Sequence, residues 1–234
     1  MLRVEHLSFS YDMVQVLWDI SFEADEKEIT VVIGPNGAGK STLVSLIAGL
    51  NKPAAGTISF NKERIDNLPA YSIVKRGISL VPEGRRVFPQ MSVYENLLMG
   101  AYPVTDSTQI KRSIEQAYQI FPILKEKRRH MARTMSGGEQ QMLVIARGLM
   151  SNPRLLVLDE PSLGLAPILV EKMLDAVTQI NESGVTVLLV EQNMDFALNL
   201  ADNVHVMSRG LMVYSSSPQE LLENENIRRS FLGI

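Results

Sequence analysis

The sequence predicts an α/β protein with a mainly parallel core sheet, and three observations support this fold class. Strand-like apolar runs alternate with helical segments in the second half of the chain, which is the pattern of a parallel sheet. A glycine-rich loop lies between a buried apolar run, Ile29–Ile33, and a helix predicted over Thr42–Leu50. A mainly helical stretch at 87–150 interrupts the alternation, which indicates an inserted lobe.

Apolar alternation and turn residues place the other elements of the first half. Strands are predicted at Leu2–Leu7 and Ile20–Ala24, with a polar turn at Asp25–Lys27 before the buried run. Two further short strands are predicted at Gly56–Phe60 and Gly77–Pro82. All of them precede the helical stretch, so we expect them to build the first part of the core.

Helix signals dominate the inserted stretch. Ser92 with Glu95 and Ser136 with Glu139 each form a capping box, in which the serine and the glutamate satisfy each other's free backbone N–H groups. Apolar residues at helical spacing from Ile110 to Phe121 predict a further helix between them. The helices after the two boxes are predicted over 96–101 and 140–150.

The pattern of alternating strands and helices resumes after residue 150. The predicted elements are a strand Leu155–Asp159, a helix from Pro167 to Ile180, a strand Val185–Val190, a helix Met194–Ala201, a hairpin Val204–Ser208 with Leu211–Ser215, and two helices after Ser217-Pro218. We therefore expect one domain with a core at 1–86 and 151–234 and a helical lobe at 87–150.

Composition excludes several classes of function. The 234 residues contain no cysteine, which excludes a disulfide scaffold, a thiolate metal site and a cysteine nucleophile. With only 3 histidines, a histidine-ligated zinc centre is also disfavoured. The formal net charge of −3 argues against a general nucleic-acid binder. Apolar runs of about six residues are far shorter than the ~20 that span a bilayer, and residues 1–20 lack a signal-peptide core, so we expect a cytoplasmic chain.

The segment Gly34–Ser41 matches the phosphate-binding pattern G-x-x-x-x-G-K-[ST]. Its glycines let successive backbone N–H groups turn toward phosphate oxygens, and the following helix adds the positive end of its dipole. Lys40 is expected to reach the β- and γ-phosphates, and the Ser41 hydroxyl to ligate Mg²⁺. ATP and Mg²⁺ are thus the expected cofactors. The predicted ATP-binding residues here are Gly34, Pro35, Asn36, Gly37, Ala38, Gly39, Lys40, Ser41 and Thr42.

Two carboxylates end the apolar strand Leu155–Asp159. Consecutive side chains on a strand point in opposite directions, so we expect Asp159 and Glu160 to take different tasks. Asp159 is expected to hold Mg²⁺ through water, and Glu160 to reach a water beside the γ-phosphate. Beside a phosphate-binding loop, this pair predicts nucleotide hydrolysis.

The segment Met135–Gln141 resembles the LSGGQ-type signature of ABC ATPases, with Met135 in place of the usual leucine. Two glycines at a helix start cost about 1 kcal/mol each relative to alanine, and they allow backbone N–H groups to approach an anion. The resemblance implies two chains facing head-to-tail, with each nucleotide between one chain's phosphate loop and the other chain's signature. This arrangement is physically sensible, because the chain's own γ-phosphate is already surrounded. The expected signature residues, acting in trans, are Ser136, Gly137, Gly138 and Glu139.

With these motifs in this order, the whole chain resembles the ATP-binding subunit of an ABC transporter. The resemblance implies a P-loop NTPase fold with an N-terminal antiparallel β subdomain and an inserted helical subdomain. It also implies that Tyr11 stacks on adenine. The implied partners are a second ABC ATPase chain, like or unlike, two transmembrane permease subunits and, indirectly, a solute-binding protein, but no nucleic acid. The implied location is the cytoplasmic face of the membrane.

Three departures from the common family pattern narrow the resemblance. Glu83 stands where a glutamine usually contacts Mg²⁺ and the attacking water, Ala166 replaces an aspartate, and Gln192 replaces the switch histidine. Together, the segments around these residues resemble the second ATPase of branched-chain amino acid importers. We therefore expect Glu160, Gln192 and Glu83 to form the catalytic group, with Glu83 also among the metal ligands.

Several alternatives remain open at this point. Urea and amide importers are close relatives, and a soluble ABC ATPase such as an iron–sulfur assembly ATPase shares the motifs. A regulatory chain with little hydrolysis is a further possibility because of Glu83 and Gln192. A chromosome or repair ATPase is disfavoured because no heptad stretch is long enough for a coiled coil. We expect His205 to be an ordinary strand side chain, and the basic residues of the helical stretch to be a solvated face; they are Lys125, Lys127, Arg128, Arg129 and Arg133.

Overall fold

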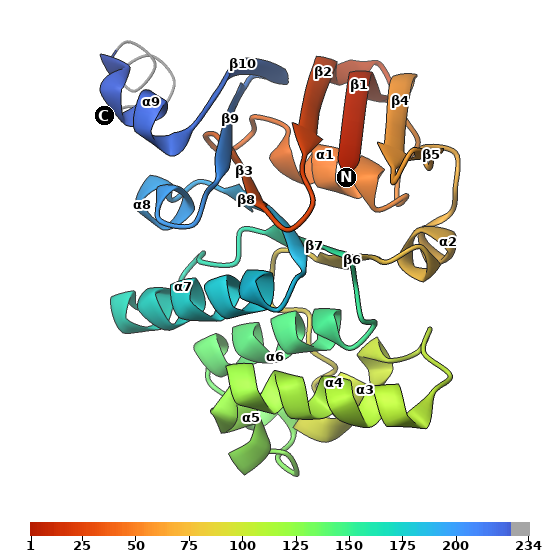
Figure 1. Cartoon of the computed structure of the whole chain (residues 1–234), viewed down its shortest axis with the longest axis vertical. Coiled ribbons are helices and arrows are strands. Elements are labelled where there is room, and N and C mark those ends of the chain that lie inside the picture. The colour runs from red at the N-terminus through yellow and green to blue at the C-terminus, as the bar shows by residue number, and fades with distance from the viewer. Residues whose placement is uncertain (226–234) are drawn as a thin grey trace.

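The computed structural model describes residues 1–225, and its core is a six-stranded sheet in the order β10-β9-β3-β8-β7-β6 (Figure 1). All neighbours pair in parallel except β10 and β9, which form an antiparallel hairpin. The strands are β3 (Ile29–Ile33), β6 (Ile78–Val81), β7 (Leu155–Asp159), β8 (Thr186–Glu191), β9 (Asn203–Ser208) and β10 (Leu211–Ser216). The predicted parallel core sheet is confirmed.

A second, antiparallel sheet is formed by the first strands of the chain. Its order is β2-β1-β4-β5, and it packs over helix α1 (Figure 1). The strands are β1 (Leu2–Tyr11), β2 (Val14–Ala24), β4 (Ala55–Phe60) and β5 (Glu63–Arg64). The first two strands are longer than predicted because they extend to meet each other in a hairpin about Asp12, whose φ is 49°. The predicted antiparallel β subdomain is confirmed.

The helices lie around the core sheet and below it (Figure 1). They are α1 (Lys40–Ile47), α2 (Ala70–Lys75), α3 (Val93–Gly100), α4 (Ser107–Ile120), α5 (Pro122–Glu126), α6 (Gly137–Leu149), α7 (Pro167–Glu182), α8 (Met194–Leu198) and α9 (Pro218–Glu223), with a 3₁₀ turn at Ala132–Thr134. Helices α2 and α5 and strand β5 were not predicted, since each is too short to show a periodicity. The second predicted C-terminal helix lies outside the described residues.

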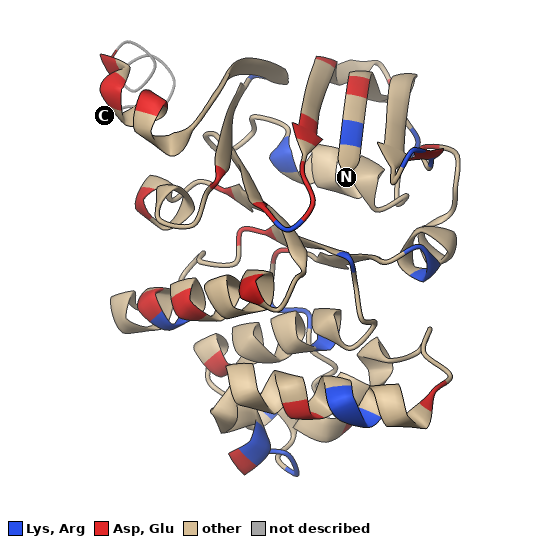
Figure 2. Cartoon of the chain, viewed as in Figure 1, with Lys and Arg blue, Asp and Glu red and all other residues tan. Residues whose placement is uncertain are grey.

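Helices α3 to α6 fall within 87–150, as proposed for the inserted lobe; the exact domain bounds stay a proposal. The first helix begins two residues earlier than predicted, directly at Lys40, and ends at Ile47, ahead of Gly49 with its φ of 68°. Lys and Arg are interspersed with Asp and Glu over the whole ribbon (Figure 2). No helix within residues 1–225 has both the length and the apolar character needed to cross a bilayer.

The buried strands of the core sheet contact two separate apolar cores. On β3, Val31 and Ile33 face the core shared with the helical lobe, whereas Val32 faces the core beneath the antiparallel sheet. On β7, Leu156 and Leu158 face the first core, and Leu155 and Val157 the second core. This alternation explains why these strands are apolar at every position. It also fixes the register of the strand ends that carry the polar site residues.

The structure places His205 on β9 with its ring against Phe22, at 5.2 Å between ring centroids, and within 2.8 Å of the Ser215 hydroxyl. The side chain thus belongs to the strand packing. Burial lowers its pKa below the usual 6.5, while a hydrogen bond with the Glu23 backbone opposes that shift.

A lowered pKa predicts a stability loss in acid. Below pH 6.5 His205 becomes protonated in the unfolded chain but stays neutral in the folded chain until the pH reaches its lower folded pKa. The free energy of unfolding therefore falls as the pH drops from 6.5 toward that pKa, and His205 does not affect it above 6.5. We expect His205→Gln to lessen the fall in unfolding free energy between pH 7 and pH 5, measured in urea. An unchanged pH dependence in this variant would contradict the assignment.

Candidate nucleotide site

The phosphate-binding loop connects β3 to α1. Gly39 caps the helix with a φ of 103°, and Gly37 has a φ of 79° with no atom near its missing side chain. A methyl group on Gly34 would lie 2.1 Å from the Met207 carbonyl oxygen. Glycine is therefore needed at 34 for close packing and at 37 and 39 for backbone conformation. The loop leads directly into the N-terminus of α1, where free backbone N–H groups suit a phosphate.

Lys40 is almost fully buried, with 4% of its surface exposed. Its ammonium group donates to the carbonyl oxygens of Gly34 and Pro35, at 2.8 and 3.3 Å. The same nitrogen lies 3.0 Å from Glu160 Oε1, forming a buried ion pair. A phosphate oxygen entering the loop would compete with these acceptors for the lysine, so nucleotide binding and the freedom of Glu160 are linked.

Asp159 faces the beginning of α1. Its Oδ1 accepts a hydrogen bond from the Ser41 hydroxyl at 3.2 Å. Burial raises the pKa of Asp159 to about 6, the Ser41 bond opposes the shift, and the charges of Glu160 and Glu83 add to it. Glu83 thus lies near enough for its charge to act on this carboxylate.

These oxygen donors fit Mg²⁺, which prefers one or two carboxylates together with hydroxyl, water and phosphate oxygens. No group of three or more His, Asp or Glu within residues 1–225 could hold a metal ion by itself. The site therefore suits a cation that shares its ligands with a bound nucleotide. Ser41 and Asp159 are the residues that would hold it, with Glu83 beside them.

Glu160 departs from the expectation that it points away from Asp159. The strand ends at Asp159, and Glu160 has a left-handed φ of 49°, so the alternation of strand side chains no longer applies to it. Its side chain turns toward Lys40, and its backbone N–H donates to the Val190 carbonyl at 2.8 Å. Both carboxylates consequently contact the start of α1, Asp159 at Ser41 and Glu160 at Lys40.

The remaining predicted residues sit at the edges of this centre. Gln192 is exposed, directly after β8, and its backbone N–H donates to the Glu191 carboxylate at 3.1 Å. Tyr11 ends β1, has 48% of its surface exposed and contacts Phe9 edge-on at 4.8 Å. No hydrogen bond or ion pair among the described residues joins either side chain to the phosphate loop.

The signature residues begin α6. Ser136 is the N-cap, and the predicted capping box with Glu139 is present. A methyl group on Gly138 would lie 2.3 Å from the Leu169 side chain of α7, and one on Gly137 would lie 2.1 Å from the Arg85 guanidinium. Both glycines thus have a packing reason in addition to the expected approach of an anion. Lys127, one of the basic residues expected on a solvated face, forms an ion pair with Glu139 at 2.6 Å and stays 32% exposed.

The sequence model of the ABC transporter family matches residues 17–163, which include the phosphate loop, Ser136–Gly138 and both carboxylates. This chain belongs to the ABC transporter family. ATP binding and hydrolysis are the general activity of this family.

Relatives match the chain along its whole length. BraG of Pseudomonas aeruginosa, a high-affinity branched-chain amino acid transport ATP-binding protein, is 45% identical over 100% of both chains. LivF of Archaeoglobus fulgidus, a probable branched-chain amino acid transport ATP-binding protein, is 37% identical over 100% of this chain and 99% of its own. LptB of Escherichia coli K12, the ATP-binding protein of the lipopolysaccharide export system, is 30% identical over 99% of this chain and 97% of its own.

Solved structures confirm the ABC ATPase fold. An ATP-binding cassette of an ABC transporter in its ADP conformation superposes with a TM-score of 0.85 and 28% identity, covering 98% of this chain and 97% of its own. The cbiO1 subunit of a Clostridium perfringens ABC transporter complex superposes with a TM-score of 0.86 and 27% identity. The match covers 97% of this chain and 92% of cbiO1.

Two residues near the site make contacts that the sequence did not predict. Glu191 is buried at the end of β8 and accepts hydrogen bonds from three backbone N–H groups. Arg85 donates to the Leu163 and Gly164 carbonyls, at 3.3 and 2.8 Å, and lies against Gly137. The only signal for Glu191 was a carboxylate directly after an apolar strand, and Arg85 was expected to belong, with Arg86 and Phe88, to a docking surface.

Proposed function

We propose that this chain is the ATP-hydrolysing subunit of an importer for branched-chain amino acids. The observation that carries the proposal is the 45% identity with BraG over the complete length of both chains. The lipopolysaccharide export relative is more distant, at 30%. The urea and amide importers weighed above differ in solute rather than in chemistry, so an uptake assay separates them from this proposal.

In the proposed mechanism, Lys40 binds the β- and γ-phosphates and gives up its ion pair with Glu160. Glu160 is then free to accept a proton from the attacking water, while Gln192 and Glu83 orient that water. Mg²⁺, when bound, supplies positive charge to the phosphates. Ser41 and Asp159 would hold this ion. Their side chains lie together, at 3.2 Å between the Ser41 hydroxyl and Asp159 Oδ1, which supports this role. Tyr11 stacks on the adenine.

A second ATPase chain, like or unlike, completes the proposed site head-to-tail. Ser136 and its neighbours at the α6 N-terminus would then face the partner's nucleotide, and the exposed position of Ser136 supports this arrangement. Two permease subunits, served by a solute-binding protein, would hold the pair at the cytoplasmic face of the membrane.

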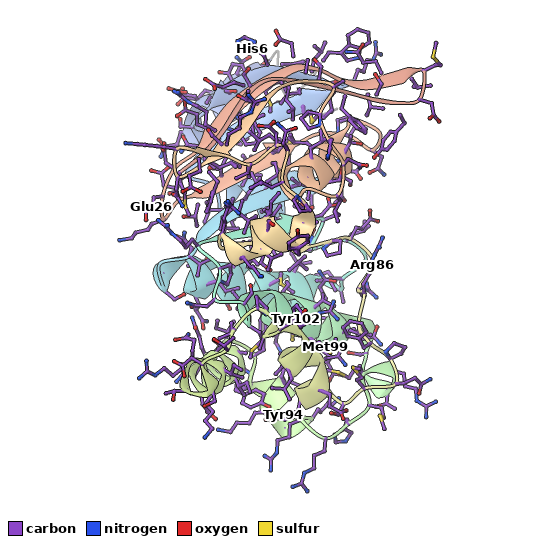
Figure 3. The ribbon with its side chains drawn as sticks, turned by 90° about the vertical axis from the view of Figure 1, so that its right-hand side faces the viewer. His6, Glu26, Arg86, Tyr94, Met99 and Tyr102 are labelled. Carbon is purple, nitrogen blue, oxygen red and sulfur yellow. The ribbon has the colours of Figure 1, made fainter. Side chains whose placement is uncertain are left out.

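The surface for the permease is proposed at the junction between the core sheet and the helical lobe. Phe88, Met99 and Tyr102 are exposed there, at 40%, 45% and 88% of their surface. Arg86, Met99 and Tyr102 lie together on one side of the molecule in Figure 3. Phe88 and Met99 also line a cavity of about 260 Å³ together with residues of β6 and α6. Exposed aromatic, methionine and arginine side chains are typical of a protein interface.

The backbone of Phe88 is held in place by hydrogen bonds that do not involve its ring. Its N–H and C=O both bond to the buried Asn96 side chain, at 2.8 and 3.0 Å, and the Arg147 guanidinium lies 4.9 Å from its ring centroid. We expect Phe88→Asp to fold, since the new carboxylate would face Arg147, and to keep basal ATPase within about 2-fold of the parent.

Uptake of labelled leucine, isoleucine and valine into cells carrying Phe88→Asp as the sole copy should fall to that of cells lacking the chain. Leu222→Asp on α9, which replaces a comparably exposed leucine away from the lobe, is the control and should keep uptake. Loss of urea uptake instead of amino acid uptake would overturn the proposed solute. Normal amino acid uptake by the Phe88 variant would place the docking surface elsewhere.

A further inference from the structure

Glu191 joins three loops of the nucleotide site. Its Oε1 accepts the backbone N–H of Ser162 at 2.9 Å, and its Oε2 accepts those of Gln192 and Asn193 at 3.1 and 3.2 Å. Its own carbonyl accepts the N–H of Gly34 at 3.3 Å. One residue therefore contacts the start of the phosphate loop, the loop after Glu160 and the loop of Gln192.

Three backbone N–H groups meet the two carboxyl oxygens of the buried Glu191. The residue is 1% exposed, and no lysine, arginine or histidine within residues 1–225 forms an ion pair with it. Burial raises its pKa, and the N–H groups of Ser162 and Asn193 oppose that shift. A carboxylate offers acceptors on both oxygens, whereas a glutamine amide would present its NH₂ group to one of the two sets of donors. Only the carboxylate satisfies all three N–H groups.

Because both oxygens of Glu191 are engaged and the side chain is buried, it does not itself meet the nucleotide. Its effect passes through its neighbours. Ser162 lies two residues after Glu160, and Gln192 directly follows Glu191. Glutamine has more rotatable bonds than the histidine usual at this position, so its backbone must be held firmly for the amide to orient a water.

We propose that Glu191 is a positioning residue that locks the loop of Gln192 to the loop after Glu160, so that both take their catalytic places together. The inference rests on the proposed roles of Glu160 and Gln192. It does not depend on the solute that the transporter carries.

The test uses steady-state ATPase of the assembled transporter carrying Glu191→Gln. We expect kcat to fall by about 10- to 100-fold, the scale of a misplaced catalytic group, while the KM for ATP stays within about 2-fold. The matched control is Asp202→Ala, which removes another carboxylate bond to a backbone N–H, that of Ile29 at 2.8 Å, at the other end of β3. The control should shift the thermal midpoint without lowering kcat.

A double-mutant cycle separates positioning from mere stability. Gln192→Ala should slow the parent, but it should slow the Glu191→Gln background much less, since the amide is already misplaced there. Equal slowing in both backgrounds, or a rise in KM with unchanged kcat, would overturn the proposal. A parent rate untouched by Gln192→Ala would overturn it as well. A transporter of another solute with the expected ATPase pattern would refute only the proposed solute.

Discussion

Replacing Glu160 by glutamine is expected to leave ATP binding intact and to lower hydrolysis by about 10²-fold or more, the usual contribution of a general base. Glutamine keeps the shape and can still accept a hydrogen bond from Lys40, whose ammonium lies 3.0 Å from Glu160 Oε1. It cannot accept a proton at neutral pH. The phosphate loop should therefore fold and bind as before, and only the chemical step should fail.

Hydrolysis is measured as phosphate release at saturating ATP, and binding by calorimetry. With hydrolysis blocked, ATP should also trap the proposed head-to-tail dimer, seen as an earlier peak in size-exclusion chromatography. Glu83→Gln is the matched control, because Glu83 is the other carboxylate near Asp159. A larger loss in the Glu83 variant than in the Glu160 variant would assign the general base to Glu83.

Lys40→Ala should weaken ATP binding by about 10- to 100-fold, corresponding to the 1.5–3 kcal/mol of a hydrogen bond to a charged group, and should abolish turnover. The substitution also leaves the 8% exposed Glu160 without its cation. Breaking a buried ion pair from one side costs about 3–5 kcal/mol, so the nucleotide-free variant should unfold at lower urea concentration.

The double variant Lys40→Ala with Glu160→Gln separates these two effects. It removes the unpaired charge, so it should recover much of the stability that Lys40→Ala loses, yet it should still bind ATP weakly. Urea unfolding and calorimetry on the same preparations give both quantities. Full ATPase activity in Lys40→Ala would refute the role of the phosphate loop.

The sequence alone was sufficient for the features that depend on neighbouring residues. The phosphate loop is one uninterrupted motif whose glycines have local conformational reasons, such as the φ of 103° at Gly39. The capping boxes at Ser92 and Ser136 are four-residue patterns, and both are present. Strand and helix periodicities are also local, so the α/β class and the parallel core could be predicted from them.

Tertiary structure decided which of these local features meet. The ion pair of Lys40 with Glu160 and the bond of Ser41 with Asp159 each join residues more than one hundred positions apart. The left-handed backbone of Glu160, which turns its side chain toward Lys40, has no local signal in a residue that usually avoids positive φ.

The hydrogen bonds of Glu191 show most clearly why some contacts cannot be predicted from the sequence. Its three donors are backbone N–H groups, which every residue except proline carries. No pattern of side chains therefore predicts these hydrogen bonds. They meet one carboxylate only because β7 and β8 pair in parallel, with Asp159 opposite Val190, and so bring the loops that follow the two strands to the same edge of the sheet. The sequence motifs were sufficient to nominate the candidate residues Lys40, Asp159 and Glu160. The contacts among the loops that carry the site arise from the pairing of β7 with β8.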